Sequence, residues 1–265
     1  MINMVRADLF KMFKSNTIKI LFGITSLGAI LMMVMAYLIP QGKLSENMSG
    51  IGFMFSDVNM MSILGAVLAG IFICGDFDNK AIHQAIASGC SRGAVIIGKG
   101  IVFFIGIAFL ILPYMIVTGI AIATGSKFSM GAIGIGFLNI LSNESGKSID
   151  GSMILKLIFI MVILVIVYIA QLSICVPLAL ALKKPVLVIA IFYGLSILSG
   201  QLSLLSKSSK PLRNFLYSTP FGGDYSLITL GSETETLVKA ILVSLYFTVI
   251  MLNITYGIFK RAEIK

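Results

Sequence analysis

Long apolar stretches alternate with shorter polar segments along this chain. A helix needs about 20 apolar residues to cross the hydrocarbon core of a bilayer, and the apolar stretches lie close to or above that length. Backbone polar groups in lipid must be satisfied within their own segment, which favours helices, and the alternating pattern of a membrane β-barrel is absent. We therefore predict six membrane-spanning helices, at about 20–39, 58–75, 101–124, 154–182, 186–206 and 238–259.

Composition agrees with this pattern. Hydrophobic residues make up 58% of the 265 residues and charged residues only 12%, whereas a soluble domain carries roughly a quarter charged residues. This number of apolar side chains is too large for one globular core. Lipid must therefore be the solvent for much of the surface. We predict an all-α integral membrane protein with a single six-helix domain over residues 1–265.

Basic residues indicate how the chain is oriented. The apolar stretch at 20–39 follows several lysines, but it is longer than the core of a signal peptide and no convincing cleavage site follows it, so we expect an uncleaved span. Lysine and arginine are more numerous in the segments that share a side with both termini. This bias predicts cytoplasmic termini. It also explains the net charge of +9 without a nucleic-acid partner.

Three segments outside the spans have a character of their own. In residues 3–15, Val5, Leu9 and Phe13 recur at helical spacing opposite basic residues, which predicts an interfacial helix at the cytoplasmic headgroups; a basic leader that only sets topology is the alternative. Extracellular segments follow the third and fifth spans, at 125–153 and 207–237, and we expect the second to form short helices at the outer interface.

The stretch GAVIIGKG, at residues 93–100, imitates a phosphate-binding loop. The pattern G-x-x-x-x-G-K-[ST] is matched except for Gly100, which stands where a hydroxyl would bind Mg²⁺. The stretch follows no buried strand, leads directly into a predicted span and has no α/β domain around it. We therefore expect this chain to bind no nucleotide and to be no enzyme by itself.

Ionisable residues are nearly absent from the predicted spans. Asp57, Lys156 and Lys239 lie at the outer edges, and the single histidine, His83, lies in a cytoplasmic loop. Ion-driven transporters usually place such residues inside their spans, so the pattern weakens a secondary-transport mechanism. Polar residues within the spans are explained first by interhelical hydrogen bonds and second by substrate contact. The candidates for a substrate pathway are Tyr168, Gln171, Tyr193 and Ser196.

The longest cytoplasmic loop predicts a short amphipathic helix at about 77–89. Phe77, Ile82 and Ile86 fall on one helical face, polar residues fall largely on the other, and Gly89 is placed to end the helix. Asp76 and Asp78 are the alternative candidates for its N-cap. Such a short helix is unstable alone, so it needs either the membrane surface or the groove of a partner protein.

This loop resembles the cytoplasmic loop of type-2 ABC exporter permeases. The residues that carry the resemblance are GDFDNKAI at 75–82, SGCSR at 88–92 and the Gly98–Lys99 pair. The family often has Thr at the position of Ala81 and Val at that of Cys90. The six spans, the cytoplasmic termini, the N-terminal helix and the long outer segment after the fifth span extend the resemblance to the whole topology.

The resemblance implies a role for each matching residue. The loop would be the coupling helix, which docks on a separate cytoplasmic ATPase. Ser91 and Arg92 would cap and anchor the turn, and Lys99 would join Val5, Leu9 and Phe13 at the membrane interface. The docking candidates are Asp76, Phe77, Asp78, Asn79, Ile82 and Ile86.

The resemblance also implies partners and a function. A pair of ABC ATPase subunits would hold ATP and Mg²⁺, and a second permease copy or a paralogue would complete the complex in the bacterial cytoplasmic membrane. The expected function is ATP-driven export of an antimicrobial or other amphipathic peptide. Alternatives are a drug or lipid efflux permease of the same family, a membrane scaffold or sensor that does not transport, and a secondary transporter.

Overall fold

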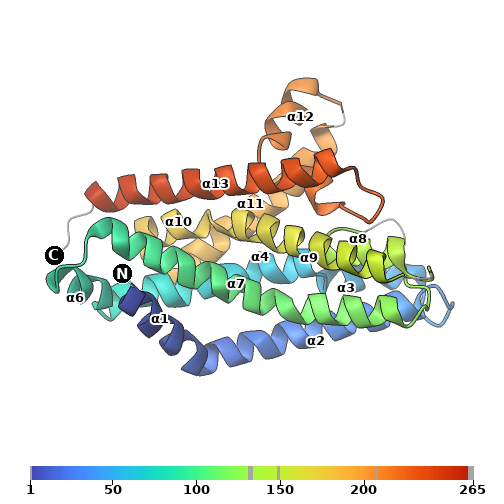
Figure 1. Ribbon diagram of the computed structural model, residues 1–265, viewed down its shortest axis with the longest axis horizontal. Helices are drawn as coiled ribbons and strands as arrows, with labels where there is room; N and C mark the ends of the chain where they lie inside the picture. Colours follow the sequence, from blue (N-terminus) through green and yellow to red (C-terminus); the bar gives the residue numbers. More distant parts are fainter. Residues whose placement is uncertain (1, 131–133, 148–149, 207, 262–265) are drawn as a thin grey trace.

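A computed structural model describes residues 2–130, 134–147, 150–206 and 208–261, and all regular structure within these residues is helical. The helices form an elongated bundle (Figure 1). The start of the first helix and the end of the last lie at the same end of this bundle, which we call the termini end; the opposite end is called the far end.

Six helical segments are long and apolar enough to cross a membrane, as the hydropathy pattern predicted. Each predicted apolar stretch matches one of these segments; the stretches 20–39 and 101–124 end one residue beyond α2 and α7, and elsewhere the helices extend past the predicted limits. The polar residues at those limits remain helical because a helix satisfies its backbone whether lipid or water surrounds it. The segments are α2 (Asn16–Leu38), α4 (Asp57–Ala69) with η2 (Gly70–Cys74) and α5 (Gly75–Asp78), α7 (Arg92–Ala123), α9 (Gly151–Leu172) with α10 (Cys175–Leu182), α11 (Pro185–Ser206) and α13 (Thr234–Arg261).

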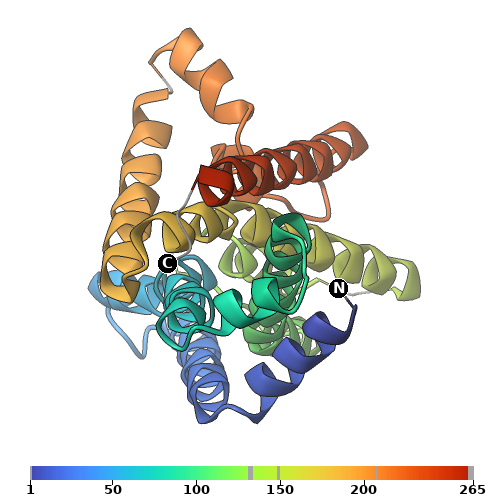
Figure 2. The ribbon, with the colours of Figure 1, turned by 90° about the vertical axis from the view of Figure 1, so that its left-hand side faces the viewer.

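Shorter helices lie at the two ends. At the termini end are α1 (Ile2–Lys14) and α6 (Ala81–Ala87), and at the far end are α3 (Ser49–Met54) and α8 (Phe137–Glu144) (Figure 1). The segment after α11 forms α12 (Lys210–Tyr217), which projects sideways from the bundle, as Figure 2 shows in an end-on view. Two short 3₁₀ turns complete the secondary structure of the described residues, η1 (Glu46–Met48) and η3 (Gly223–Ser226).

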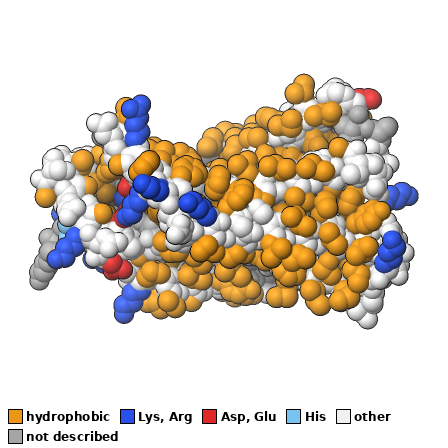
Figure 3. Space-filling view, turned by 90° about the horizontal axis from the view of Figure 1, so that it is seen from below, with side chains coloured by type: hydrophobic (Ala, Val, Ile, Leu, Met, Phe, Trp, Pro, Cys, Tyr) orange, Lys and Arg blue, Asp and Glu red, His pale blue; other side chains and the backbone are white. Residues whose placement is uncertain are grey.

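Helix α7 contributes much of the core. Its residues Phe103, Ile107 and Leu110 are buried, and α7 contacts α1, α2, α4, α9 and α13. By contrast, α11 and α13 expose many large apolar side chains. Figure 3 shows hydrophobic side chains over most of one face, with the lysines and arginines towards the two ends. Such an apolar belt is what a lipid-facing surface requires.

A small residue allows one close helix contact near the middle of the second span. A Cβ atom added at Gly70 would lie 2.9 Å from the Cβ of Pro185, at the start of α11. Gly70 opens the π-helical turn η2, and Ala66, one turn earlier, is fully buried. Small residues at this spacing allow two helices to approach closely within a membrane.

The predicted helix at 77–89 is divided in two. Phe77 and Asp78 belong to α5, which continues the second span, and the chain then turns at Lys80, whose φ of 55° is left-handed. A residue in that conformation cannot continue a right-handed helix, so α6 begins only at Ala81. Gly89 has a φ of 92° and follows the end of α6, as predicted. Neither Asp76 nor Asp78 caps a helix, because the N-cap positions of α5 and α6 are Cys74 and Lys80.

Candidate functional site

Helix α1 lies along α7 at the termini end. Side chains of Met4 and Val5 cover Gly98, and the ring of Phe13 meets that of Phe109 edge-on, with 5.2 Å between centroids. Val5 and Leu9 are partly buried against the core, whereas 41% of Phe13 is exposed. The apolar face that we expected to rest on lipid is thus partly covered by the chain's own third span.

Four charged side chains meet where α1, α5 and α7 come together, and we call them the ion-pair cluster: Asp8, Lys11, Asp76 and Lys99. The ammonium group of Lys99 contacts Asp8 Oδ2 at 2.7 Å and also Oδ2 of Asp76. Lys11 pairs with the other oxygen of Asp76 at 2.5 Å. Two positive and two negative charges therefore balance within the cluster, which lowers the cost of burying them.

Two of the sequence predictions fail at this cluster. Lys99 was expected at the lipid headgroups, but only 10% of its side chain is exposed and both of its partners are carboxylates of this chain. Asp76 was expected on a docking surface, but its side chain is 4% exposed. The partners of Lys99 are 91 and 23 residues away in sequence, so no local pattern reveals the pairing.

Helix α6 packs its apolar face on the rest of the chain. Ile82 is 1% exposed and Ile86 is partly buried. The ring of Phe77, just before α6, lies 6.4 Å from that of Phe259 and 5.1 Å from the ammonium of Lys183. Of the six predicted docking residues, Asp78 and Asn79 are therefore the ones with exposed side chains.

The turn after α6 is anchored as predicted. Ser91 caps α7, because its hydroxyl accepts a hydrogen bond from the backbone N–H of Ala94 at 3.3 Å. Arg92 donates to the carbonyls of Phe259 and Lys260, at 3.0 and 2.7 Å, and so satisfies the end of α13. The whole of GAVIIGKG lies in α7, so it forms no phosphate-cradling loop.

A second feature lies towards the far end, where α4, α9 and α11 enclose a cavity of about 370 Å³. Three of the four predicted pathway residues, Tyr168, Gln171 and Ser196, line it. Tyr193 does not line this cavity, and 37% of it is exposed. The remaining walls come from residues 134–135 and from the segment that ends at Leu227.

Asp57 lies at the edge of its span, as the sequence suggested, and it is completely buried there behind one wall of this cavity. The hydroxyl of Tyr168 and the backbone N–H of Phe137 (3.1 Å) both donate to its Oδ2. Its Oδ1 has no hydrogen-bond partner within the described residues. Asp57 begins α4 and contacts the first residue of α8, and the N-termini of both helices favour a negative charge.

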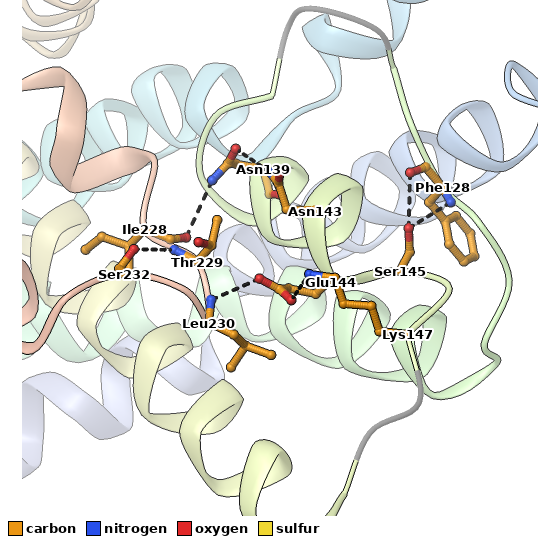
Figure 4. Close-up of polar contacts among 10 residues, drawn as sticks. All are labelled: Phe128, Asn139, Asn143, Glu144, Ser145, Lys147, Ile228, Thr229, Leu230 and Ser232. Atoms are coloured by element: carbon orange, nitrogen blue, oxygen red, sulfur yellow. Dashed lines mark hydrogen bonds and ion pairs between the residues drawn. The ribbon is translucent and has the colours of Figure 1, made fainter.

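Helix α8 closes the far end of the bundle and is fastened to the segment that precedes α13 (Figure 4). The buried carboxylate of Glu144 accepts a hydrogen bond from the backbone N–H of Leu230 at 3.0 Å and pairs with Lys147 at 2.8 Å. Asn139 also reaches the carbonyl of Ile228, at 3.5 Å. No sequence pattern marked the contacts with Leu230 and Ile228, since both join segments more than 80 residues apart.

The length and composition of the helices place the chain among multi-pass α-helical membrane proteins. No protein-family model matches the chain, and no curated protein matches it in sequence. The functional argument therefore starts from the residues and contacts of the chain itself.

Proposed function

We propose that the chain is the membrane-spanning permease subunit of an ATP-driven exporter of the type-2 ABC class, with ATP hydrolysed by separate subunits. The resemblance of residues 75–99 to the coupling loop of that class supports the proposal, as do the six apolar helices. The chain would lie in the bacterial cytoplasmic membrane with its termini end in the cytoplasm, where the ATPases would bind.

The ion-pair cluster is the observation that carries this proposal. A coupling helix is useful only if a displacement at its surface reaches the spans. Helix α6 lies between α5 and α7 in sequence, and Lys99 of α7 joins Asp76 of α5 to Asp8 of α1. Separating buried charges is costly, so these helices are expected to move together.

The exposed side of α6 and of the residues that flank it is the surface on which we expect the ATPase to dock. Asp78, Asn79, Gln84 and Ser88 all have exposed side chains there. This surface replaces the one inferred from sequence, because Asp76 and Ile82 are occupied inside the chain. Their expected role changes from contacting the partner to holding α5 and α6 in place.

The cargo that fits the sequence best is an amphipathic peptide, with drugs and lipids as alternatives of the same class. A scaffold or sensor subunit that does not transport would also use an exposed amphipathic helix to bind a cytoplasmic protein. Binding of an ABC ATPase distinguishes the exporter from the scaffold. Stimulation of ATP hydrolysis by the permease is a second result that the exporter predicts and the scaffold does not.

Co-purification tests the proposal. The tagged chain, expressed with the products of its neighbouring genes, should bring down an ABC ATPase and stimulate its activity. Asn79→Arg combined with Gln84→Arg should abolish both effects, because both side chains face solvent at the termini end.

Asn214→Arg is the matched control, since it adds the same exposed group on α12. It should leave the complex intact, and thermal unfolding should show that every variant remains folded. If no ATPase binds the unsubstituted chain, the exporter assignment is wrong. If the double variant still binds and stimulates the ATPase, α6 is not the docking helix.

A further inference from the structure

The cavity at the far end has a polar wall without formal charge. None of the described residues that line it is Lys, Arg, Asp or Glu. Its polar side chains come from Ser62 on α4, Tyr168 and Gln171 on α9, three serines on α11, and Ser226 in η3. The rings of Phe192 and Phe221 also line it. The three serines of α11 are Ser196, Ser199 and Ser203.

The hydroxyl hydrogens of this wall are largely engaged. Ser62 donates its single hydrogen to the carbonyl of Val58 at 2.7 Å. The hydrogen between Ser62 and Ser196, whose oxygens are 2.8 Å apart, therefore belongs to Ser196. Ser199 donates to the carbonyl of Ser196 at 2.7 Å. Each of these hydroxyls uses its hydrogen in a bond within the chain, and its oxygen lone pairs can still accept a hydrogen bond.

The larger side chains also present oxygen atoms that can accept a hydrogen bond from a ligand. The hydroxyl of Tyr168 donates to Asp57, which leaves its oxygen as an acceptor. The side-chain amide of Gln171 donates to the carbonyl of Pro220 at 2.8 Å. A carbonyl only accepts, so the amide nitrogen must face Pro220. This bond uses one of the two N–H groups of Gln171, and the side-chain oxygen remains an acceptor for a ligand. Ser203 makes no side-chain hydrogen bond within the described residues, so its hydroxyl can serve either way.

A negative group stands directly behind this acceptor-rich wall. Asp57 is bonded to Tyr168, one of its carboxylate oxygens has no partner in the described chain, and no described lysine or arginine pairs with it. A buried carboxylate without a positive partner is costly, and a nearby cation repays part of that cost. The rings of Tyr168, Phe192 and Phe221 also attract cations through their faces.

We propose that the cavity binds the protonated primary amine of an amphiphile. An ammonium group carries three donors and no acceptor, which complements a wall whose hydroxyl donors are largely engaged and whose oxygens can accept. A volume of about 370 Å³ lies at the lower end of the range for ligand sites, so it suits an amine and the first part of an apolar body. That this amphiphile is the exported cargo rests on the proposed function, whereas its binding does not.

Equilibrium binding to the purified chain tests the proposal without any ATPase. The probes are octylamine, which is protonated at pH 7, and 1-octanol, measured by calorimetry with the full chain in nanodiscs of zwitterionic lipid and with empty nanodiscs as the blank. Octylamine should bind at least tenfold more tightly than octanol. Asp57→Asn should weaken octylamine at least tenfold and leave octanol unchanged, because the amide keeps an acceptor for Tyr168 but removes the charge.

Glu144→Gln is the matched control. It neutralises another buried carboxylate at the same end of the bundle, and Glu144 does not line the cavity. It should leave both affinities unchanged. Should Asp57→Asn fold poorly in thermal unfolding, Tyr168→Phe offers a second route, because it removes one acceptor of the wall and keeps the ring; octylamine should again bind more weakly.

Three results would overturn the proposal. Equal affinity for octylamine and octanol would mean that charge is not recognised. Unchanged octylamine binding in folded Asp57→Asn would mean that the carboxylate has no part in it. Octyltrimethylammonium, which has the charge and no N–H donor, should bind more weakly than octylamine; equal binding would refute the role of the acceptors. Each outcome is independent of whether an ATPase binds at α6.

Discussion

At the scale of single residues, Lys99 was predicted to contact lipid headgroups, but its ammonium group contacts two carboxylates of its own chain. We predict that Lys99→Met lowers the free energy of unfolding by about 3 kcal/mol, because it leaves negative charges buried without their shared partner. Lys11 still pairs with Asp76 in this variant, so the expected loss of stability lies near the lower end of the range for breaking a buried ion pair. Denaturant unfolding of the purified protein in detergent measures this difference.

A double variant and an exposed pair serve as controls for Lys99. Adding Asp76→Asn to Lys99→Met should recover part of the stability, since it removes one of the uncompensated charges. Lys239→Met breaks a pair with Glu235 at 4.0 Å in which both side chains are exposed, and it should cost less than about 1 kcal/mol. Equal effects of Lys99→Met and Lys239→Met would contradict the view that the ion-pair cluster holds the termini end together.

At the scale of elements, the position of α8 depends on one glycine. Gly136 precedes α8 with a φ of 65° and a ψ of −133°, and a Cβ atom there would overlap both Asp57 and the hydroxyl of Tyr168. Gly136→Ala therefore combines backbone strain with a collision, and we predict a loss of at least about 2 kcal/mol of stability. Gly194→Ala, within α11 and with no atom within 4 Å, should be neutral or stabilising by up to about 1 kcal/mol.

Thermal unfolding of the two glycine variants measures this difference in stability. The same samples should show whether α8 has moved, because a displaced α8 would expose Glu144 and its contact with Leu230. Amide hydrogen exchange in residues 137–144 should accordingly accelerate in Gly136→Ala and remain unchanged in Gly194→Ala. If Gly136→Ala keeps both its stability and its exchange rates, α8 is not held against Asp57 in the way described.

The elements were predictable from sequence to the extent that lipid dictates them. A span must be long, apolar and helical, so the six segments follow from hydropathy alone. The break at Lys80 did not follow, because the apolar spacing of Phe77, Ile82 and Ile86 is the same with or without a turn between them. Of the candidate sites, the cap at Ser91 is local and was predicted. An anchoring role for Arg92 was expected from the resemblance, but its partners on α13 are 167 and 168 residues away and were not foreseen. The partners of Asp57 and Lys99 depend on how distant helices pack, and local spacing contains no record of that.

At the scale of the whole molecule, one continuous helical segment joins the two features of interest. Helix α4, η2 and α5 run from Asp57, behind the cavity, to Asp76 in the ion-pair cluster. The π-helical turn η2 interrupts the regular hydrogen bonding between them, and such turns frequently occur at functional sites. A displacement at α6 would therefore reach the cavity wall along this segment, which is the coupling that the proposed exporter requires.

The orientation of the molecule in the membrane gives the last prediction. Both α1 and α6 lie at the termini end and α12 lies beyond the end of α11, so an even number of spans separates α1 from α6 and an odd number separates α6 from α12.

Ser88→Cys and Asn214→Cys place thiols on exposed positions of these two sides. Cys74 and Cys175 are buried, so Cys90→Ser gives a suitable background. A membrane-impermeant maleimide should label the Asn214→Cys protein in intact cells and the Ser88→Cys protein only after permeabilisation, because the basic residues favour a cytoplasmic termini end. Labelling of both in intact cells would contradict the six-span topology, and the reverse pattern would invert the orientation and remove α6 from the reach of any cytoplasmic ATPase.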